Sequence, residues 1–115
     1  MDHKDLEVWK KSMDLVAEVY HWTKSLPDDE KFGLMSQMRR AAVSIPSNIA
    51  EGSARKGDKE LIYFVNVAIG SVAELETHYL IALRLGFSDS NKVLSDLLIN
   101  VKKLLLGYRN YVVKK

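Results

Sequence analysis

Apolar residues recur at alternating steps of four and three along the second half of the chain. The first series consists of Leu61, Val65, Ala68, Val72, Leu75, Tyr79 and Ala82. The second consists of Leu94, Leu97, Val101, Leu104, Tyr108 and Tyr111. A spacing of about 3.5 residues keeps apolar side chains on one side of a helix and is typical of long helices that pack at shallow angles. The pattern therefore predicts an all-α protein.

The breaks between the apolar segments predict four helices, at residues 5–25, 33–54, 58–85 and 90–112. Pro27 ends the first helix, because proline disfavours helical geometry in the residue before it. Asp58 is the expected N-cap of the third helix, Gly86 ends that helix, and residues 88–90 supply capping oxygens for the fourth. With such short connections, we expect residues 1–115 to form one antiparallel up-down four-helix bundle.

Composition narrows the possible classes of protein. A single domain of 115 residues needs no disulfide or metal ion to fold. The chain has no cysteine, which is usual for a cytosolic protein. No apolar run approaches the ~20 residues that span a bilayer, and the charged stretch MDHKDLEVWKK predicts no signal peptide. We therefore expect a cytoplasmic protein that has no cofactor and does not bind a membrane.

The net charge is only +2, but the charges are segregated along the chain. Residues 32–59 carry five basic and two acidic side chains, and residues 92–115 carry six and one. The second and fourth helices run parallel in an up-down bundle, so the end of the fourth should lie near the turn after the second. The candidate nucleic-acid-binding residues are Arg55, Lys56, Lys59, Lys102, Lys103, Arg109, Lys114 and Lys115. A basic surface attracts polyanions, although a solvated helix face has the same composition.

The first helix has two apolar stripes. At about 100° per residue, one stripe comprises Leu6, Trp9, Met13, Val16 and Tyr20. The other is rotated by about 125° and comprises Val8, Leu15, Val19, Trp22 and Leu26. A monomeric bundle would leave one stripe in water, and large exposed apolar patches usually mark a partner surface. We therefore predict that the second stripe is the interface of a homo-oligomer. The alternative is a first helix that is deeply buried in a monomer.

The second helix carries polar residues among its apolar ones. If it runs antiparallel to the third helix around Gly57, polar residues of the two helices face each other, as in the expected pair of Arg40 with Glu74. We interpret these residues as a polar seam that fixes the register of the helices. Its predicted members are Gln37, Arg39, Arg40, Ser44, Asn48, Glu51, Asn66, Ser71, Glu74 and Glu76. An active site in the same groove and a partner surface are the alternatives.

No pattern in the sequence indicates catalysis. Di-iron bundles use two Glu-x-x-His motifs, and only Glu18–His21 matches, because Glu74 and His78 are spaced by four. The arginine–histidine spacing of helical nucleases is absent. Ser44, Ser47 and Ser71 have no histidine base nearby in the sequence, and there is no phosphate-binding glycine loop. We expect a protein that is not an enzyme.

Three stretches carry a family resemblance: QMRRAAVSIPSNIAEG (37–52), FVNVAIGSVAELE (64–76) and LRLGF (83–87). With Val8-Trp9, they resemble the 23S rRNA intervening-sequence proteins over nearly the whole chain. The resemblance implies an antiparallel four-helix bundle that assembles as a ring-like homopentamer. The family name reflects a genomic location within rRNA genes and not an activity. A similar protein, the accessory factor of diversity-generating retroelements, is a basic pentamer that binds nucleic acid and a reverse transcriptase.

Two functions are compatible with these observations. The first is a non-enzymatic oligomeric scaffold that binds RNA or DNA through the basic residues, with contacts to phosphates that are independent of base sequence. Tyr63 is the aromatic residue that we consider for base stacking. The second is a protein–protein adaptor whose partner is another protein and for which the basic residues are only a solvated rim.

Overall fold

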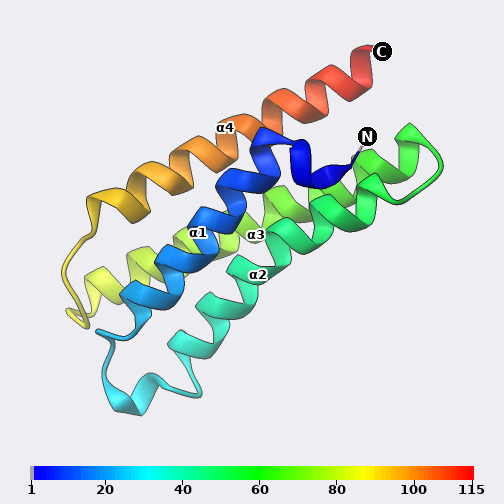
Figure 1. Ribbon diagram of the computed structural model, residues 1–115. Helices are drawn as coiled ribbons and strands as arrows, with labels where there is room; N and C mark the ends of the chain where they lie inside the picture. Colours follow the sequence, from blue (N-terminus) through cyan, green and yellow to red (C-terminus); the bar gives the residue numbers. More distant parts are fainter. Residues whose placement is uncertain (1) are drawn as a thin grey trace.

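The computed structural model describes residues 2–115, and over that range it contains four α-helices and no strand (Figure 1). The helices are α1 (Glu7–Thr23), α2 (Leu34–Ser53), α3 (Asp58–Arg84) and α4 (Lys92–Lys114). Single 3₁₀ turns, η1 (His3–Asp5) and η2 (Asp28–Glu30), precede α1 and α2. Each helix boundary lies within two residues of the predicted one. The all-α class and the order of the four helices are confirmed.

The signals that end or begin a helix act in part as predicted. Gly86 ends α3 with a positive φ of 72°, and the Phe87 N–H donates to the Ala82 carbonyl at 3.0 Å, which is the pattern of a Schellman motif. The predicted cap of α4 within residues 88–90 is wrong. Instead, the Asn91 side chain accepts a hydrogen bond from the Leu94 N–H at 2.9 Å. Asp58 is the first residue of α3 and not its N-cap, where its charge still favours the positive end of the helix dipole.

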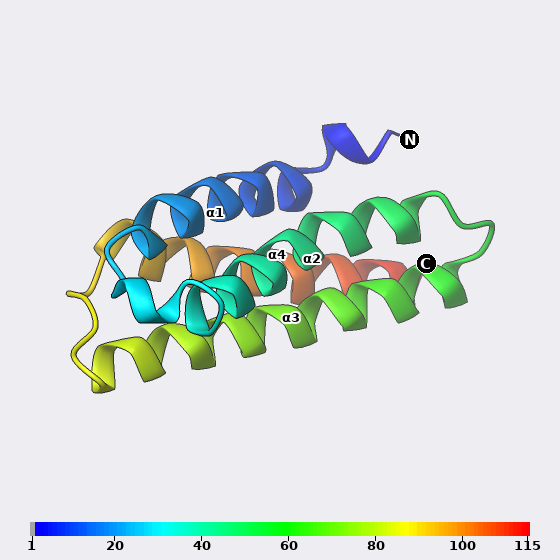
Figure 2. The same cartoon turned by 90° about the horizontal axis from the view of Figure 1, so that it is seen from below.

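The helices form an antiparallel up-down bundle in which α1 and α3 each pack against both α2 and α4. The bundle measures 45 × 24 × 20 Å. Figures 1 and 2 show that the N-terminus, the α2–α3 turn and the C-terminus lie at one end, and that the two other connections lie at the opposite end. None of the described helices combines the length and the apolar character needed to cross a membrane.

Hydrogen bonds close the end of the bundle that holds the α3–α4 loop. The Trp22 indole N–H donates to the Asp89 carbonyl at 2.9 Å, and the Trp22 ring meets the Tyr79 ring edge to face. The Tyr79 hydroxyl accepts from the Asn91 backbone N–H at 2.8 Å, and the Asn91 side-chain amide donates to Glu18. These contacts attach the α3–α4 loop to α1 and α3.

The core confirms the predicted apolar face of α3 and corrects that of α4. Val65, Ala68, Val72, Leu75, Tyr79 and Ala82 are all buried, as predicted. In α4 the buried side chains are Leu94, Leu98, Val101, Leu105 and Val112. Leu94 and Val101 are buried as predicted, but Leu98 and Leu105 replace Leu97 and Leu104, so the centre of the α4 core face is rotated by about 60° from the predicted one. Leu97 and Leu104 pack only against the margin of the core.

The assignment of the oligomer interface to the second stripe of α1 is wrong. Val8, Leu15, Val19, Trp22 and Leu26 are each at most 5% exposed and belong to the core of the single bundle. The first stripe instead faces outward in part, with Met13 44% and Tyr20 40% exposed. Two apolar stripes on one helix allow either to face inward, and the periodicity alone does not distinguish them. The second stripe therefore belongs to the core of the bundle, whereas the first stripe is only partly covered.

The polar seam is confirmed at one contact only, because Ser44 Oγ and Ser71 Oγ lie 2.8 Å apart. Arg39 turns to α1, where its Nε donates to Thr23 Oγ1 at 2.9 Å. Asn48 donates to the carbonyl of Ser44 in its own helix, and Glu76 is half-buried without an ion pair among the described residues. The remaining predicted members are exposed to solvent, namely Gln37, Arg40, Glu51, Asn66 and Glu74. Antiparallel neighbours share a height in the bundle, but a shared height does not turn two side chains toward each other.

Candidate nucleic-acid interface

The C-terminal part of α4 lies beside the start of α3, as the up-down topology predicts. Lys115 Nζ is 3.6 Å from Asp58 Oδ1, and the Arg109 guanidinium donates to Asn66 Oδ1 at 2.9 Å. Both contacts join α4 to the first third of α3. The basic residues at the end of α4 are therefore close to the α2–α3 turn, although they lie more than forty positions from it in the sequence.

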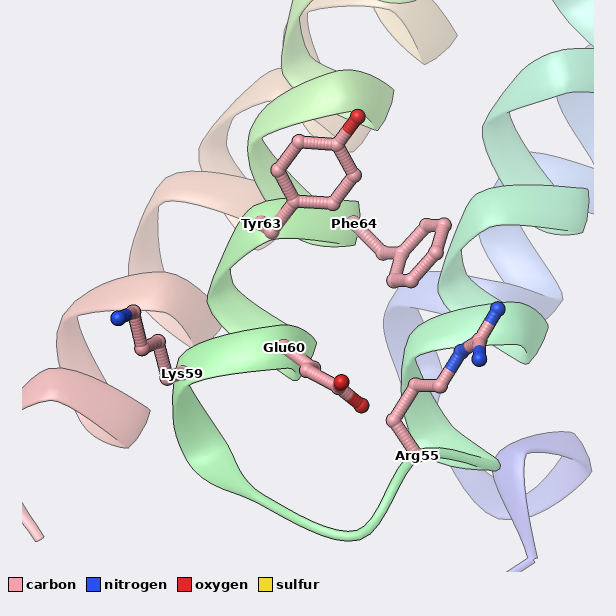
Figure 3. A pocket seen from close by; sticks show the side chains of 5 residues that line it. All are labelled: Arg55, Lys59, Glu60, Tyr63 and Phe64. Atoms are coloured by element: carbon pink, nitrogen blue, oxygen red, sulfur yellow. The ribbon is translucent and has the colours of Figure 1, made fainter.

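A shallow groove of about 550 Å³ beside this turn is lined by Arg55, Lys59, Glu60, Tyr63 and Phe64 (Figure 3). The Arg55 guanidinium lies 5.0 Å from the centre of the Phe64 ring, and its Nη2 is 2.6 Å from Glu51 Oε1. The ring and the i,i+4 carboxylate together hold Arg55 along α2. In Figure 3, Glu60 points toward Arg55, whereas Lys59 points away from it, toward α4. The positive charge inside the groove is thus partly neutralised, and Lys59 lies at its outer edge.

Tyr63 fits the role that the sequence leaves open for it. Its side chain is 63% exposed, and its ring lies edge to face with Phe64, with 5.1 Å between ring centres. An exposed aromatic ring next to cations is suited to stacking on a nucleic-acid base, which every base permits through its π face. Phe64, in contrast, is half-buried against Arg55.

The eight predicted basic residues do not form one continuous patch. Lys103 lies on a different side of the bundle, in a groove between α1 and α4 that Glu7 and Tyr108 also line. Lys102, the residue before it, is exposed. Lys56 and Lys114 are exposed at the end itself and make no ion pair within the described chain. The predicted set therefore surrounds one end of the bundle instead of covering one face.

We call this end of the bundle the basic end and define it as residues 2–14, 51–60 and 102–115. It carries eleven basic and seven acidic side chains, whereas the rest of the chain carries six and eight. Lys4, Lys10 and Lys11 were not among the predicted residues, but they belong to this end because α1 begins where α2 ends (Figure 1). The predicted antiparallel topology already places the start of the first helix beside the end of the second, so these three lysines could have been predicted. The charge of the molecule is therefore polarised along the length of the bundle.

Tyr108 lies within the basic end, half-buried between α4 and the start of α1. Burial raises the pKa of its phenol above the ordinary value, and the nearby Lys115 ammonium opposes this rise only in part. The phenol therefore stays neutral at physiological pH. It adds apolar packing and no charge to the surface around it.

The single Glu-x-x-His match does not converge on a metal site. Glu18 accepts a hydrogen bond from the Asn91 amide at 3.0 Å, and His21 is exposed. Residues 2–115 contain no group of three or more histidine, aspartate or glutamate side chains that could hold a metal ion.

Comparison with known proteins gives a family match over most of the chain. Residues 4–107 match the family model described as 23S rRNA-intervening sequence protein. A comparison with curated proteins gave no match.

Proposed function

Because the chain belongs to the 23S rRNA-intervening sequence protein family, we propose that it is a non-enzymatic scaffold that binds nucleic acid. In this proposal, copies of the chain assemble into a ring, and the basic end of each bundle contacts the phosphates of RNA or DNA. The excess of basic over acidic side chains at that end, eleven against seven, is the observation that carries the nucleic-acid function. The ring of five subunits is what the family resemblance implies.

The exposed lysines contribute most to this binding. Arg55 and Lys115 already have carboxylate partners, Glu51 and Asp58, so a phosphate must compete with an existing ion pair. Lys56 and Lys59 have no such partner in the described chain. A phosphate that contacts them releases counterions without breaking an intramolecular ion pair. Their contacts do not depend on base sequence, so both RNA and DNA are possible ligands.

Assembly increases the affinity of weak phosphate contacts. If the ring axis runs along the bundles, all the basic ends lie on the same face of the ring. A long nucleic acid then meets several basic ends at once, and each later contact is intramolecular with a high effective concentration. A single bundle of this modest charge binds much more weakly.

The test is binding of purified protein to a labelled structured RNA and to duplex DNA across about 50 to 200 mM salt, with the mass measured by light scattering in the same buffers. We expect affinity to fall steeply with salt. We expect Lys56→Glu/Lys59→Glu to reduce the slope of log affinity against log salt by about one for each phosphate that the variant no longer binds. Lys24→Glu/Lys92→Glu makes the same change of charge at the opposite end and should leave the slope nearly unchanged.

An oligomer that ignores both polyanions at low salt would contradict the nucleic-acid function. The second candidate function, a protein–protein adaptor, would then explain the molecule better. It is favoured by Phe32, whose side chain is 89% exposed beside a groove between α1 and α2.

A further inference from the structure

The outer face of α3 is apolar although no helix of the chain covers it. Val67, Gly70, Glu74, Thr77 and Ile81 fall within an arc of about 80° on a helical projection. All five are exposed, and Leu80 beside them is 56% exposed. Glu74 is the one exposed acidic or basic residue between positions 61 and 83. Figure 2 shows α3 along the lower edge of the bundle, with no helix below it. A helix that is apolar on all sides is normally buried on all sides.

A groove that fits such a helix runs between α1 and α2. Its first part encloses about 360 Å³ and is lined mainly by apolar side chains, among them Trp9, Met13, Val43 and Pro46. Its second part shares Val43 and adds a group of cations, Lys31, Arg39 and Arg40. The groove therefore changes from apolar to basic toward the end of the bundle that holds the α1–α2 connection.

The heights of these residues in the bundle match. The Ser44–Ser71 hydrogen bond shows that residues of α2 and α3 whose numbers add up to about 115 lie at one height. Contacts of a Cβ placed at Gly52 with Leu61 and Phe64 give the same register. Glu74 is therefore level with Arg40 and Ala41.

Apolar residues match on both sides of that charged level. Val67 and Gly70 are level with the apolar part of the groove around Pro46, and Ile81 is level with Leu34 and Met35. Arg40 forms no ion pair within the described chain, and Glu74 has only His78, at 3.9 Å. An exposed cation and an exposed carboxylate at one height are thus available to neighbouring copies.

We propose that the outer face of α3 packs into the α1–α2 groove of a second copy of this chain, with Glu74 facing Arg40 of that copy. The inference rests on the self-assembly part of the proposed function and adds the faces and the register. The two faces differ, so the contact is head to tail. They are also not on opposite sides of the bundle, because α2 belongs to the groove and is adjacent to α3. Successive copies therefore turn, which allows the assembly to close into a ring.

Rotation about an axis parallel to the bundles preserves height, which is why residues of one height meet in such a ring. The long side of the bundle measures 45 by 24 Å. A side of that size has room for the roughly 800 Å² per partner that a standard stable interface buries, with residues beside the outer face of α3 contributing to the contact.

The first test is Gly70→Arg, with Gly107→Arg as its matched control. A Cβ at either glycine has no neighbouring atom within 4 Å, and arginine has a higher helix propensity than glycine. Both variants should therefore keep the helical circular-dichroism spectrum of the wild type. We expect light scattering to give an oligomer for the wild type and for Gly107→Arg. For Gly70→Arg we expect a mass near that of a single chain, 13.1 kDa.

The second test is a charge exchange that fixes the register. Arg40→Glu and Glu74→Arg each place like charges opposite one another and should raise the dissociation constant of the assembly about tenfold or more. The double variant restores opposite charges at that contact and should reassemble. Rescue of this kind does not occur if either substitution merely destabilises the bundle.

Each outcome bears on the proposal. A Gly70→Arg protein with the mass of the wild type, or single charge variants without effect, would overturn it. A monomeric wild type would also overturn it and leave the face to another protein. Nucleic-acid binding, measured separately with the Lys56→Glu/Lys59→Glu variant, can succeed or fail in any of these cases, so failure of the interface and failure of the nucleic-acid function are distinguishable.

Discussion

The close approach of α2 and α3 at the basic end depends on Gly52, and replacing it with alanine measures how close that approach is. A Cβ at this position would lie 3.0 Å from Leu61 Cδ1, 3.0 Å from Phe64 Cβ and 3.3 Å from the Leu61 carbonyl oxygen. The leucine methyl can move away. The other two atoms belong to or adjoin the backbone of α3, so the first turns of α3 must shift to accept the new methyl group.

Two opposing effects decide the sign of the change in stability. Alanine in place of glycine inside a helix is favourable by about 0.5–1 kcal/mol. Overpacking that forces a backbone shift costs about 1–3 kcal/mol. The net effect spans about 0 to 2.5 kcal/mol, and we expect Gly52→Ala to lower the free energy of unfolding by about 1 kcal/mol. Gly107→Ala supplies the matched control, because its Cβ has no neighbouring atom within 4 Å and only the helix gain of about 0.5–1 kcal/mol applies.

Urea denaturation followed by far-ultraviolet circular dichroism measures both variants against the wild type at one protein concentration, since oligomer stability depends on concentration. The informative quantity is the difference between the two alanine variants, because the intrinsic gain cancels. If Gly52→Ala is stabilised as much as Gly107→Ala, the reasoning is refuted, and α2 and α3 are farther apart at this turn than the structure places them.

Two further predictions concern tyrosines. Tyr79→Phe removes the hydroxyl that accepts from the Asn91 N–H at 2.8 Å, and we expect the free energy of unfolding to fall by about 1–3 kcal/mol. The control is Tyr20→Phe, which changes an exposed tyrosine and should be nearly neutral. Thermal melts that show equal effects for the two variants would contradict this prediction. Burial raises the pKa of Tyr108 above 10.0, so as pH rises through about 10 the unfolded state ionises first and the free energy of unfolding falls. Tyr108→Phe should weaken this alkaline decline in urea titrations between about pH 9 and 11, and an unchanged decline would show that other groups cause it.

A feature of this fold can be predicted from the sequence when it depends only on positions along the chain. Helix positions, the core face of α3 and the Ser44–Ser71 height follow from spacing along the chain and from rise per residue. The inward stripe of α1 does not, because it depends on whether α1 lies clockwise or anticlockwise of α2 around the bundle. Both arrangements bury one of two equally apolar stripes. Side-chain direction adds a similar ambiguity, so Arg40 and Glu74 share a height without meeting inside one chain.

The basic end was also predictable only in part. Its location could be predicted, because topology places chain ends and turns together whatever the handedness of the bundle. Its continuity could not, because the rotation of α4 decides whether Lys103 faces α1 or α3. Charge totals by segment therefore predict the polarity of the molecule better than they predict a patch.

The direction of the charge asymmetry and the position of the apolar face of α3 have a joint consequence. The charge differs between the two ends of the bundle, whereas the apolar face and the α1–α2 groove lie along its sides. Assembly through the sides thus leaves the ends uncovered, and cyclic symmetry along the bundle axis turns all the basic ends the same way. In the proposed ring, each copy adds the eleven basic and seven acidic side chains of its basic end to one face. If the bundles instead stacked end to end, the contact would bury charged side chains and leave the apolar face of α3 in water. Both effects would cost free energy. The same arrangement of residues therefore favours lateral assembly and concentrates positive charge where a polyanion can reach it.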